Sequence, residues 1–152
     1  MRLYQKEDLT PALEAEMMAL FQDYYTRTPV GADSPPLAFN WPAYEALQQA
    51  GVLHIYTVRK DAHLIGLVFY ALLPHMHHMS QIVATCFGLA VNPDARGQGL
   101  GRILIDFAKA DLKNLGAHML VHAARTCYEE TPIFERLPGF RLREKTYSLD
   151  LT

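Results

Sequence analysis

The sequence predicts an α+β fold in which a mixed, mainly antiparallel central sheet is flanked by helices. Three observations carry this prediction. The middle of the chain is a meander of segments that alternate apolar and polar residues, as strands do. A glycine-rich stretch and a strongly amphipathic helical pattern follow it. A strand, a short helix and a further strand are then expected to end the chain.

Local signals define the elements of the first part. Residues 1–5 are expected to form a short strand, and Thr10-Pro11 supplies an N-cap and a first-turn proline for a helix. The proline and glycine content of residues 28–40 predicts a loop. A short helix is expected from Trp41 to Ala50, capped by Asn40 and ended by a glycine. Apolar residues recur at helical spacing in the first helix: Leu13, Met17, Leu20, Phe21 and Tyr24.

The second part contains the best-defined helix. It begins near Gly99 and ends at Gly116. Its predicted apolar face consists of Leu100, Ile103, Leu104, Phe107, Ala108, Leu112 and Leu115. Before this helix, strands are expected over residues 52–59, 64–73 and 82–91. After it, we expect a strand over residues 119–123, a short helix over 131–137 and a final strand over 140–149.

Composition limits the classes of protein to be considered. The 152 residues are expected to form a single domain over residues 1–152, with half of them hydrophobic and a fifth charged. A net charge of −2 gives no basic field for nucleic acid. The N-terminal residues are too polar for a signal peptide, and no apolar run approaches a membrane span. With only two cysteines, a reducing cytoplasm is the expected location.

The stretch from Arg96 to Gly101, with sequence Arg-Gly-Gln-Gly-Leu-Gly, is the clearest candidate for ligand binding. Glycines allow close approach of the backbone, and the first turn of the helix offers unpaired N–H groups to a phosphate. No Walker A pattern is present. A dinucleotide fingerprint that starts at Gly97 and Gly99 fails because its last position is Arg102.

The pattern that fits is Arg-x-x-Gly-x-Gly, from Arg96 to Gly101, preceded by Leu-Ala-Val-Asn-Pro-Asp. It closely resembles the acetyl-CoA loop of the GNAT family of N-acetyltransferases. The segment from Phe134 to Phe140 is similar to the Tyr-Glu-Lys-Leu-Gly-Phe ending of that family, with one proline inserted. The resemblance covers about residues 82–142 and is loosely closest to the short acetyltransferases of phages and prophages.

This resemblance implies a GNAT-like fold with two splayed central strands, residues 82–91 and 119–123, and acetyl-CoA as co-substrate. The pantetheine arm would bond to the backbone of Leu89, Ala90 and Val91. Backbone N–H groups of the loop would bind the pyrophosphate, with positive charge from two arginines nearby. The expected cofactor-binding residues are therefore Leu89, Ala90, Val91, Arg96, Gly97, Gln98, Gly99, Leu100, Gly101 and Arg102.

The chemistry expected is direct transfer of the acetyl group to a primary amine. Related enzymes often use a tyrosine as general acid where this sequence has Phe134. Tyr128 is the first candidate to replace it, although a loop tyrosine covering the core explains it equally well. His122 is a candidate base or proton shuttle, against the alternative of a structural histidine. Cys86, in a strand, is interpreted as a small buried hydrophobe.

Metal and acceptor are the least defined features. The cluster of His75, His77 and His78 lacks a complete ligand set, so a turn is expected there and no metal. The acceptor is expected to be a small-molecule or protein amine. Asp33, Glu129 and Glu130 could attract it, although exposed carboxylates are usually only solvated. Phe39, Trp41 and Tyr25 could wall an apolar pocket, although core packing explains them equally well.

Neither nucleic acid nor a membrane is expected as a partner, and a homodimer stays open. Two other functions also stay open. One is a coenzyme A-binding module without chemistry, and the other is a nucleotide-binding or interaction domain.

Overall fold

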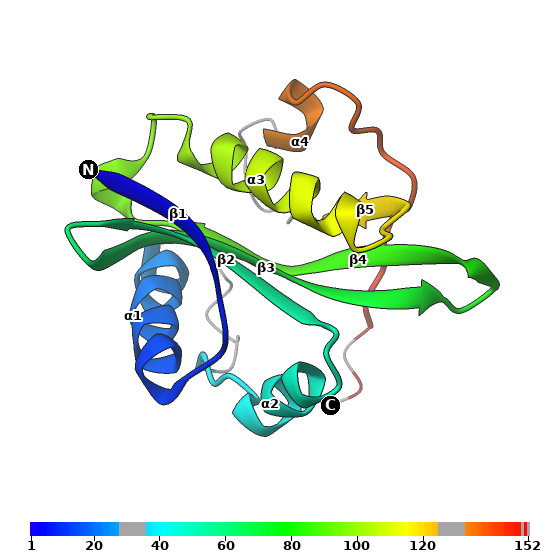
Figure 1. Ribbon diagram of the computed structural model, residues 1–152, viewed down its shortest axis with the longest axis horizontal. Coiled ribbons are helices and arrows are strands. Elements are labelled where there is room, and N and C mark those ends of the chain that lie inside the picture. Colours follow the sequence, from blue (N-terminus) through cyan, green and yellow to red (C-terminus); the bar gives the residue numbers. More distant parts are fainter. Residues whose placement is uncertain (28–35, 125–132, 150, 152) are drawn as a thin grey trace.

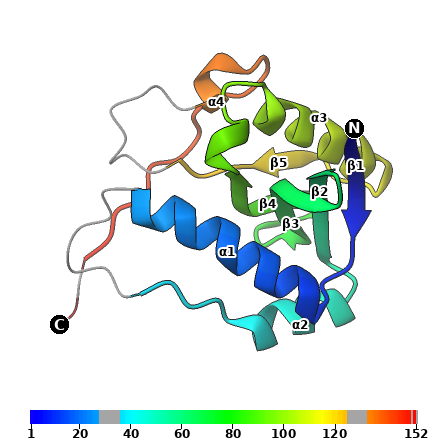
Figure 2. The ribbon, with the colours of Figure 1, turned by 90° about the vertical axis from the view of Figure 1, so that its left-hand side faces the viewer.

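The computed structural model describes residues 1–27, 36–124, 133–149 and 151. One sheet of five strands, ordered β1-β2-β3-β4-β5, divides the described part of the chain into two layers. Helices α1 and α2 cover one face of the sheet, and α3 and α4 lie on the other (Figures 1 and 2). The strands are β1 (Arg2–Glu7), β2 (Leu53–Lys60), β3 (His63–His75), β4 (His78–Val91) and β5 (Met119–Val121). The helices are α1 (Pro11–Arg27), α2 (Trp41–Gln49), α3 (Leu100–Asn114) and α4 (Ile133–Arg136), with a 3-10 turn over Pro93–Ala95.

The pairing of the strands confirms the predicted mixed, mainly antiparallel sheet. Strands β1 to β4 pair with their neighbours in the sequence in antiparallel fashion. Two-residue turns join β2 to β3 and β3 to β4, whereas α1 and α2 lie between β1 and β2. Strand β5 returns after α3 and pairs parallel with β4 over three residue pairs, Val83↔Met119 to Thr85↔Val121. The two central strands therefore lie side by side for a short distance only.

The caps predicted for the helices have their expected partners. The Thr10 hydroxyl accepts a hydrogen bond from the Leu13 N–H at 3.2 Å, and Asn40 Oδ1 accepts one from the Ala43 N–H at 3.3 Å. Gly116 follows α3 with a φ of 96°, a conformation that glycine adopts without a steric penalty. These helices begin and end close to the predicted positions because their ends are set by neighbouring residues.

Two clusters of buried side chains form the core, one on each face of the sheet. Under α1, Leu13 and Met17 pack with Phe69 of β3. Under α3, Leu104 and Leu112 pack with side chains of β2, β3 and β4. The predicted apolar face of α3 is wider than its buried stripe: Ile103, Phe107 and Leu115 lie at its edges and are 38–43% exposed. None of the described helices is long and apolar enough to cross a membrane.

The final strand predicted over residues 140–149 is wrong. Residues 141–149 form neither strand nor helix, and Leu142, Tyr147 and Leu149 are 78–87% exposed. Alternating residues make a strand only where a neighbouring strand accepts their hydrogen bonds, and β5 is only three residues long. The predicted strand over residues 119–123 is likewise shorter than expected and ends at Val121.

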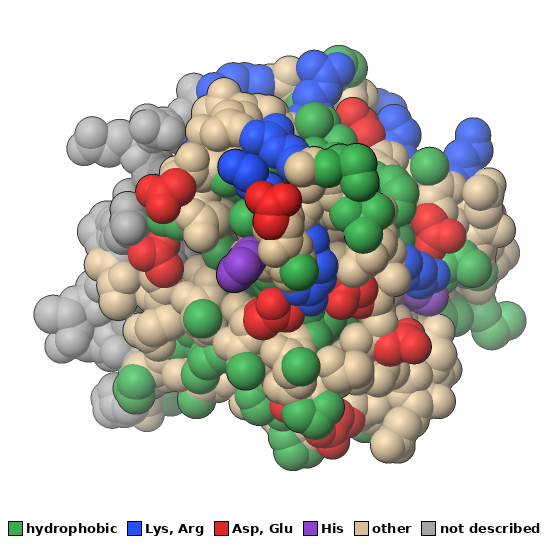
Figure 3. Space-filling model, turned by 60° about the vertical axis from the view of Figure 1, so that its left-hand side comes forward, with side chains coloured by type: hydrophobic (Ala, Val, Ile, Leu, Met, Phe, Trp, Pro, Cys, Tyr) green, Lys and Arg blue, Asp and Glu red, His purple; other side chains and the backbone are tan. Residues whose placement is uncertain are grey.

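Acidic and basic side chains are interspersed on the face shown in Figure 3, so neither sign dominates it. One group of charges joins three elements. Arg59 of β2 donates from Nε to Glu7 of β1 at 2.8 Å and from Nη2 to Glu16 of α1 at 2.7 Å. Burial alone would raise the pKa of Glu7, but hydrogen bonds from Arg59, Thr57 and Gln5 outweigh it and lower that pKa to about 2.

We expect this network to make stability depend on pH. A carboxylate with a lowered folded-state pKa stabilises the protein above its unfolded pKa of 4.5 and loses that contribution as pH falls towards 2. The free energy of unfolding at pH 7 should therefore exceed that at pH 3 by about 2 kcal/mol from this group. Urea denaturation at both pH values checks it. Most of that difference should vanish in Glu7→Gln and persist in the exposed control Glu144→Gln.

Candidate functional site

The segment that follows β4 reverses the chain and leads into α3. Asn92 Oδ1 accepts a hydrogen bond from the Asp94 N–H at 3.0 Å, which starts the turn at Pro93–Ala95. The Asn92 N–H donates to the Ile65 carbonyl at 2.8 Å. Arg96 Nε then donates to the Val91 carbonyl at 3.2 Å. The segment is therefore tied to the end of the sheet before the glycines begin.

Two of the loop glycines are required by the backbone itself. Gly97 and Gly99 have φ values of 75° and 73°, in the left-handed region that costs other residues about 1–2 kcal/mol. A Cβ placed on either glycine would meet no atom of the described residues within 4 Å. The described part of the chain therefore leaves these two side-chain positions unfilled.

Gly101 has a different explanation. It lies in the first turn of α3 without a positive φ, and among the atoms of the described residues its added Cβ would meet only Ile133 Cδ1, at an ordinary 3.6 Å. Neither backbone conformation nor packing requires glycine here, although glycine in a helix is about 1 kcal/mol less favourable than alanine. A close approach of a ligand to this backbone is the physical reason that fits.

The loop and the start of α3 together form a site for an anion. The N–H groups of Leu100, Gly101 and Arg102 have no acceptor within the helix, and the helix dipole adds partial positive charge. Arg96 is exposed beside them. Arg102 makes an exposed ion pair with Asp106, at 3.7 Å. The residues present therefore fit a pyrophosphate.

One further arginine near the loop could not be found from the sequence. Arg2 of β1 donates a hydrogen bond from Nη2 to Oε1 of Gln98. The two residues are 96 positions apart, so no sequence pattern links them. This contact brings a third guanidinium group to the predicted loop, beside those of Arg96 and Arg102.

Strands β4 and β5 part after Thr85 and Val121, as the predicted splayed pair requires. From Cys86 to Val91, no described strand lies along the outer edge of β4. Leu89, Ala90 and Val91 pair on their other side with β3. Their outer edge thus faces the gap that opens between β4 and β5, which is the position expected for residues that bond to a pantetheine arm.

A β-bulge occurs where the gap begins. Phe69 of β3 pairs with Gly88 and the next residue, Tyr70, pairs with Cys86, so Phe87 has no partner in β3. A bulge breaks the usual alternation of side chains and turns one of them to a new direction. Sequence reasoning did not identify Phe87. Glycine inside a strand at position 88 was the available signal.

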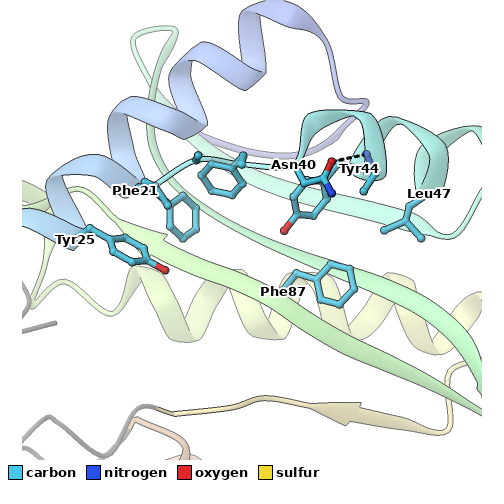
Figure 4. Close-up of a pocket in the computed structure, with 10 residues that line it drawn as sticks. Phe21, Tyr25, Asn40, Tyr44, Leu47 and Phe87 are labelled. Carbon is cyan, nitrogen blue, oxygen red and sulfur yellow. Dashed lines mark hydrogen bonds between the residues drawn. The ribbon is translucent and has the colours of Figure 1, made fainter. Parts of the chain in front are cut away.

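Phe87 borders a pocket on the face of the sheet that α1 and α2 cover (Figure 4). The pocket has a volume of about 470 Å³, within the range of small-molecule sites. Two of the three aromatic residues predicted to wall such a pocket, Tyr25 and Phe39, line it. The third, Trp41, stacks on Phe39 with ring centroids 4.7 Å apart. Tyr44 is a lining residue that was not predicted.

The other side of the gap holds the groups that could carry a proton. His122 follows β5, and its Nε2 lies 2.9 Å from the hydroxyl of the buried Tyr70. Its ring is 4.6 Å from that of Phe134, the position where the family resemblance implied a tyrosine. Burial lowers the pKa of His122 to about 4, well below the ordinary value near 6.5 on which the sequence prediction relied. The imidazole is thus neutral at physiological pH.

Burial raises the pKa of the Cys86 thiol to about 12, so this cysteine is no activated nucleophile, in agreement with its interpretation as a buried hydrophobe. Four further candidates, Tyr128, Asp33, Glu129 and Glu130, lie outside the described residues.

The histidine cluster occupies the turn between β3 and β4. His75 Nδ1 accepts a hydrogen bond from the His77 N–H at 3.1 Å, and the ring of His78 lies 4.9 Å from that of His75. Within the described ranges, no three His, Cys, Asp or Glu side chains come together as a metal site. His75 Nδ1 thus acts as a hydrogen-bond acceptor that stabilises the turn.

Metal removal is expected to leave this protein unchanged. Treatment with EDTA and dialysis should alter neither the melting temperature nor binding of acetyl-CoA, because His75 is engaged in the turn. Calorimetry before and after treatment, with metal analysis of the purified protein, checks this. Stoichiometric zinc whose loss lowers the melting temperature would show that the cluster binds metal.

Comparison with known proteins connects this geometry to a family. The model described as "Acetyltransferase (GNAT) family" matches residues 14–131, well over half of the chain. No curated protein matches the chain significantly.

Solved structures share its fold. An aminoglycoside acetyltransferase from an uncultured soil metagenomic sample, in complex with trehalose, is 13% identical with a TM-score of 0.76, over 99% of this chain and 95% of that one. A predicted acetyltransferase with acetyl-CoA from Clostridium acetobutylicum is 14% identical with a TM-score of 0.75, over 99% and 97%. A ribosomal-protein-alanine N-acetyltransferase from Brucella melitensis is 20% identical with a TM-score of 0.68, over 100% of both chains.

Proposed function

The chain belongs to the acetyltransferase (GNAT) family, and from this premise we propose that it transfers the acetyl group of acetyl-CoA directly to a primary amine. One observation carries the proposal: a glycine loop at the start of α3 lies next to the open edge of β4. The loop suits the pyrophosphate, and the edge suits the pantetheine arm. A structural neighbour that contains acetyl-CoA supports the same co-substrate.

The binding residues in this proposal are those of the loop and the strand end. N–H groups of Gln98 to Arg102 hold the pyrophosphate, and the side chains of Arg96 and Arg102 add charge. Gly97 and Gly99 give the loop its shape. The backbone of Leu89 to Val91 orients the arm so that the thioester lies in the gap between β4 and β5.

The reaction needs two proton movements. An alkyl ammonium with a pKa of about 10.4 must lose its proton before the nitrogen attacks the thioester carbonyl carbon. When the C–S bond breaks, a thiolate with a free pKa of about 8.5 takes up a proton. Because a pKa of about 4 makes His122 a weak base, we assign it the role of a shuttle for the proton, and we assign the role of acid to Tyr128.

A coenzyme A-binding module without chemistry is the second candidate function. The observation that favours it is Phe134, which stands beside His122 without a hydroxyl group. Such a module would bind acetyl-CoA through the same loop but would not release the thiol in the presence of any amine. Binding and turnover must therefore be measured separately.

Turnover of acetyl-CoA against a panel of amines tests the proposed function. The panel contains a polyamine, an aminoglycoside, free amino acids, a lysine peptide, a peptide with a free N-terminus and two arylalkylamines. Thiol release and the mass of the acetylated amine are both recorded. Steady turnover with one class supports the proposal; binding without turnover supports the second candidate. A melting-temperature shift with ATP or NAD but none with acetyl-CoA contradicts both.

A further inference from the structure

The pocket on the α1–α2 face is built mainly of aromatic side chains. Five of its described lining residues are aromatic: Phe21, Tyr25, Phe39, Tyr44 and Phe87. None of the described lining residues is an aspartate, glutamate, lysine or arginine. They come from α1, from the segment that leads into α2, from α2 itself and from β4 (Figure 4). An uncharged aromatic pocket of this kind limits the chemistry of the molecule that it can hold.

The aromatic rings around the pocket pack against one another. Phe39 meets Phe21 edge to face at 5.4 Å and stacks on Trp41 at 4.7 Å. Tyr44 meets Phe87 edge to face at 6.1 Å and Phe69 at 5.6 Å. Aromatic pairs prefer such arrangements, so little ordering is needed when a ligand binds.

The bulge in β4 places the pocket beside the gap. Phe87 lines the pocket on the α1–α2 face of the sheet. Gly88 faces the same side, because a Cβ on it would lie 2.7 Å from Phe21 Cζ and 2.5 Å from Phe69 Cε1. The absent side chain lets Phe21 and Phe69 pack there, and Phe87 keeps 44% of its surface exposed. Phe87 is two residues from Leu89, where the proposed pantetheine arm begins. The pocket therefore borders the strand segment whose outer edge faces the gap between β4 and β5.

Charge separates the classes of amine that could bind here. A polyamine or an aminoglycoside brings several ammonium groups, each of which loses hydration among lining residues that, in the part of the chain the structure describes, include no carboxylate. A ligand with a single ammonium group and an aromatic or apolar remainder loses much less hydration free energy. Aromatic faces attract the one cation and pack against the apolar part of the ligand. The hydroxyl groups of Tyr25 and Tyr44 point towards the middle of the pocket (Figure 4), so the polar atoms that they contribute there are uncharged.

We infer that the acceptor is a small arylalkylamine, that is, one primary amine on a short chain carried by an aromatic ring, bound between α1, α2 and β4. This inference rests on the proposed function for the transfer step, whereas binding in the pocket does not depend on it. The ring lies among Phe21, Phe39 and Phe87, and the amine projects past Phe87 into the gap.

Competing amines and binding of one probe test the inference. The probes are 2-phenylethylamine and tryptamine, compared with spermidine, kanamycin and free lysine. With acetyl-CoA present, kcat/KM for the aromatic amines should exceed that for each comparison amine by at least about 100-fold. Binding of 2-phenylethylamine to the protein alone, followed by calorimetry or by Trp41 fluorescence, gives a readout that needs no turnover.

Two variants locate the binding site. Phe87→Ala removes an exposed ring and should weaken 2-phenylethylamine binding about tenfold, with acetyl-CoA affinity unchanged. Ala43→Trp, at an exposed lining position, should obstruct the pocket without disturbing the core. Tyr147→Ala is the matched control because it removes a ring that is 87% exposed outside the pocket. Tyr147→Ala should change neither the affinity for 2-phenylethylamine nor the affinity for acetyl-CoA.

The outcomes separate failure of the inference from failure of the proposed function. Turnover with spermidine, kanamycin or lysine in preference to the aromatic amines overturns the inference and leaves the proposed function intact. Binding of 2-phenylethylamine that is lost in both pocket variants, without turnover of any amine, keeps the pocket assignment and overturns the proposed function. Binding that survives both variants shows that the ligand lies elsewhere and also overturns the inference.

Discussion

Replacement of Gly101 by valine is expected to abolish detectable binding of acetyl-CoA, a loss of at least about 100-fold, without unfolding the protein. The substitution places a branched side chain on the first turn of α3, where the pyrophosphate approaches the backbone. The described part of the fold tolerates a Cβ there, since within it the Cβ would meet only Ile133 Cδ1 at 3.6 Å. Isothermal titration calorimetry measures the affinity, and a thermal melt without ligand measures the fold.

Gly101→Ala is the graded control for this experiment. Alanine is a better helix former than glycine, so the variant should gain about 0.5–1 kcal/mol of stability while it binds acetyl-CoA more weakly. Opposite changes in stability and binding indicate a glycine retained for a ligand. Unchanged affinity in both the alanine and the valine variants would show that the loop does not hold the co-substrate.

Gly99 differs from Gly101 because its φ of 73° already excludes other residues. Gly99→Val should therefore lower both the binding affinity and the stability, and it cannot separate the two effects. This contrast explains why the loop could be predicted from the sequence, whereas the separate roles of Gly99 and Gly101 could not. The spacing of glycines before an amphipathic helix is a local pattern, whereas the φ angle and the neighbours of each glycine are known only from the structure.

The parts that sequence reasoning missed depend on contacts between distant segments. The bulge at Phe87 results from pairing with β3, and the Tyr70–His122 contact joins residues 52 positions apart. The lowered pKa of His122 follows from burial, which no local pattern reports. The caps at Thr10 and Asn40 were predictable because donor and acceptor are three residues apart.

Two substitutions test how protons move, and the first is Tyr128→Phe. This change removes only a hydroxyl group. If Tyr128 is the general acid, turnover should fall by about 10²–10⁴-fold, the usual contribution of a positioned acid. Affinity for acetyl-CoA should change little. Single-turnover kinetics with saturating acetyl-CoA and the best amine of the panel measures the chemical step, and Tyr147→Phe in the exposed C-terminal segment is the matched control.

His122→Gln is expected to lower the rate of the chemical step by a similar factor of about 10²–10⁴ if the imidazole relays a proton. Because burial holds the pKa of His122 at about 4, the imidazole is neutral throughout pH 6–9. The variant should therefore lower the rate evenly across that range and leave the shape of its rise with pH unchanged. That rise reports loss of the proton from the acceptor amine. A change of shape near pH 6–7 would mean that His122 titrates there and that the burial argument fails.

Phe134→Tyr in the His122→Gln background tests whether the usual position of the family's tyrosine still works here. The new hydroxyl would lie next to residue 122, since the rings of His122 and Phe134 are 4.6 Å apart. Recovery of turnover would show that the thioester lies within reach of α4 and that the proton supply had moved to His122. Full activity in Tyr128→Phe and in His122→Gln would show instead that neither side chain carries the proton. Acceleration would then come from holding the amine against the thioester, which can contribute about 7–11 kcal/mol in well-oriented reactions.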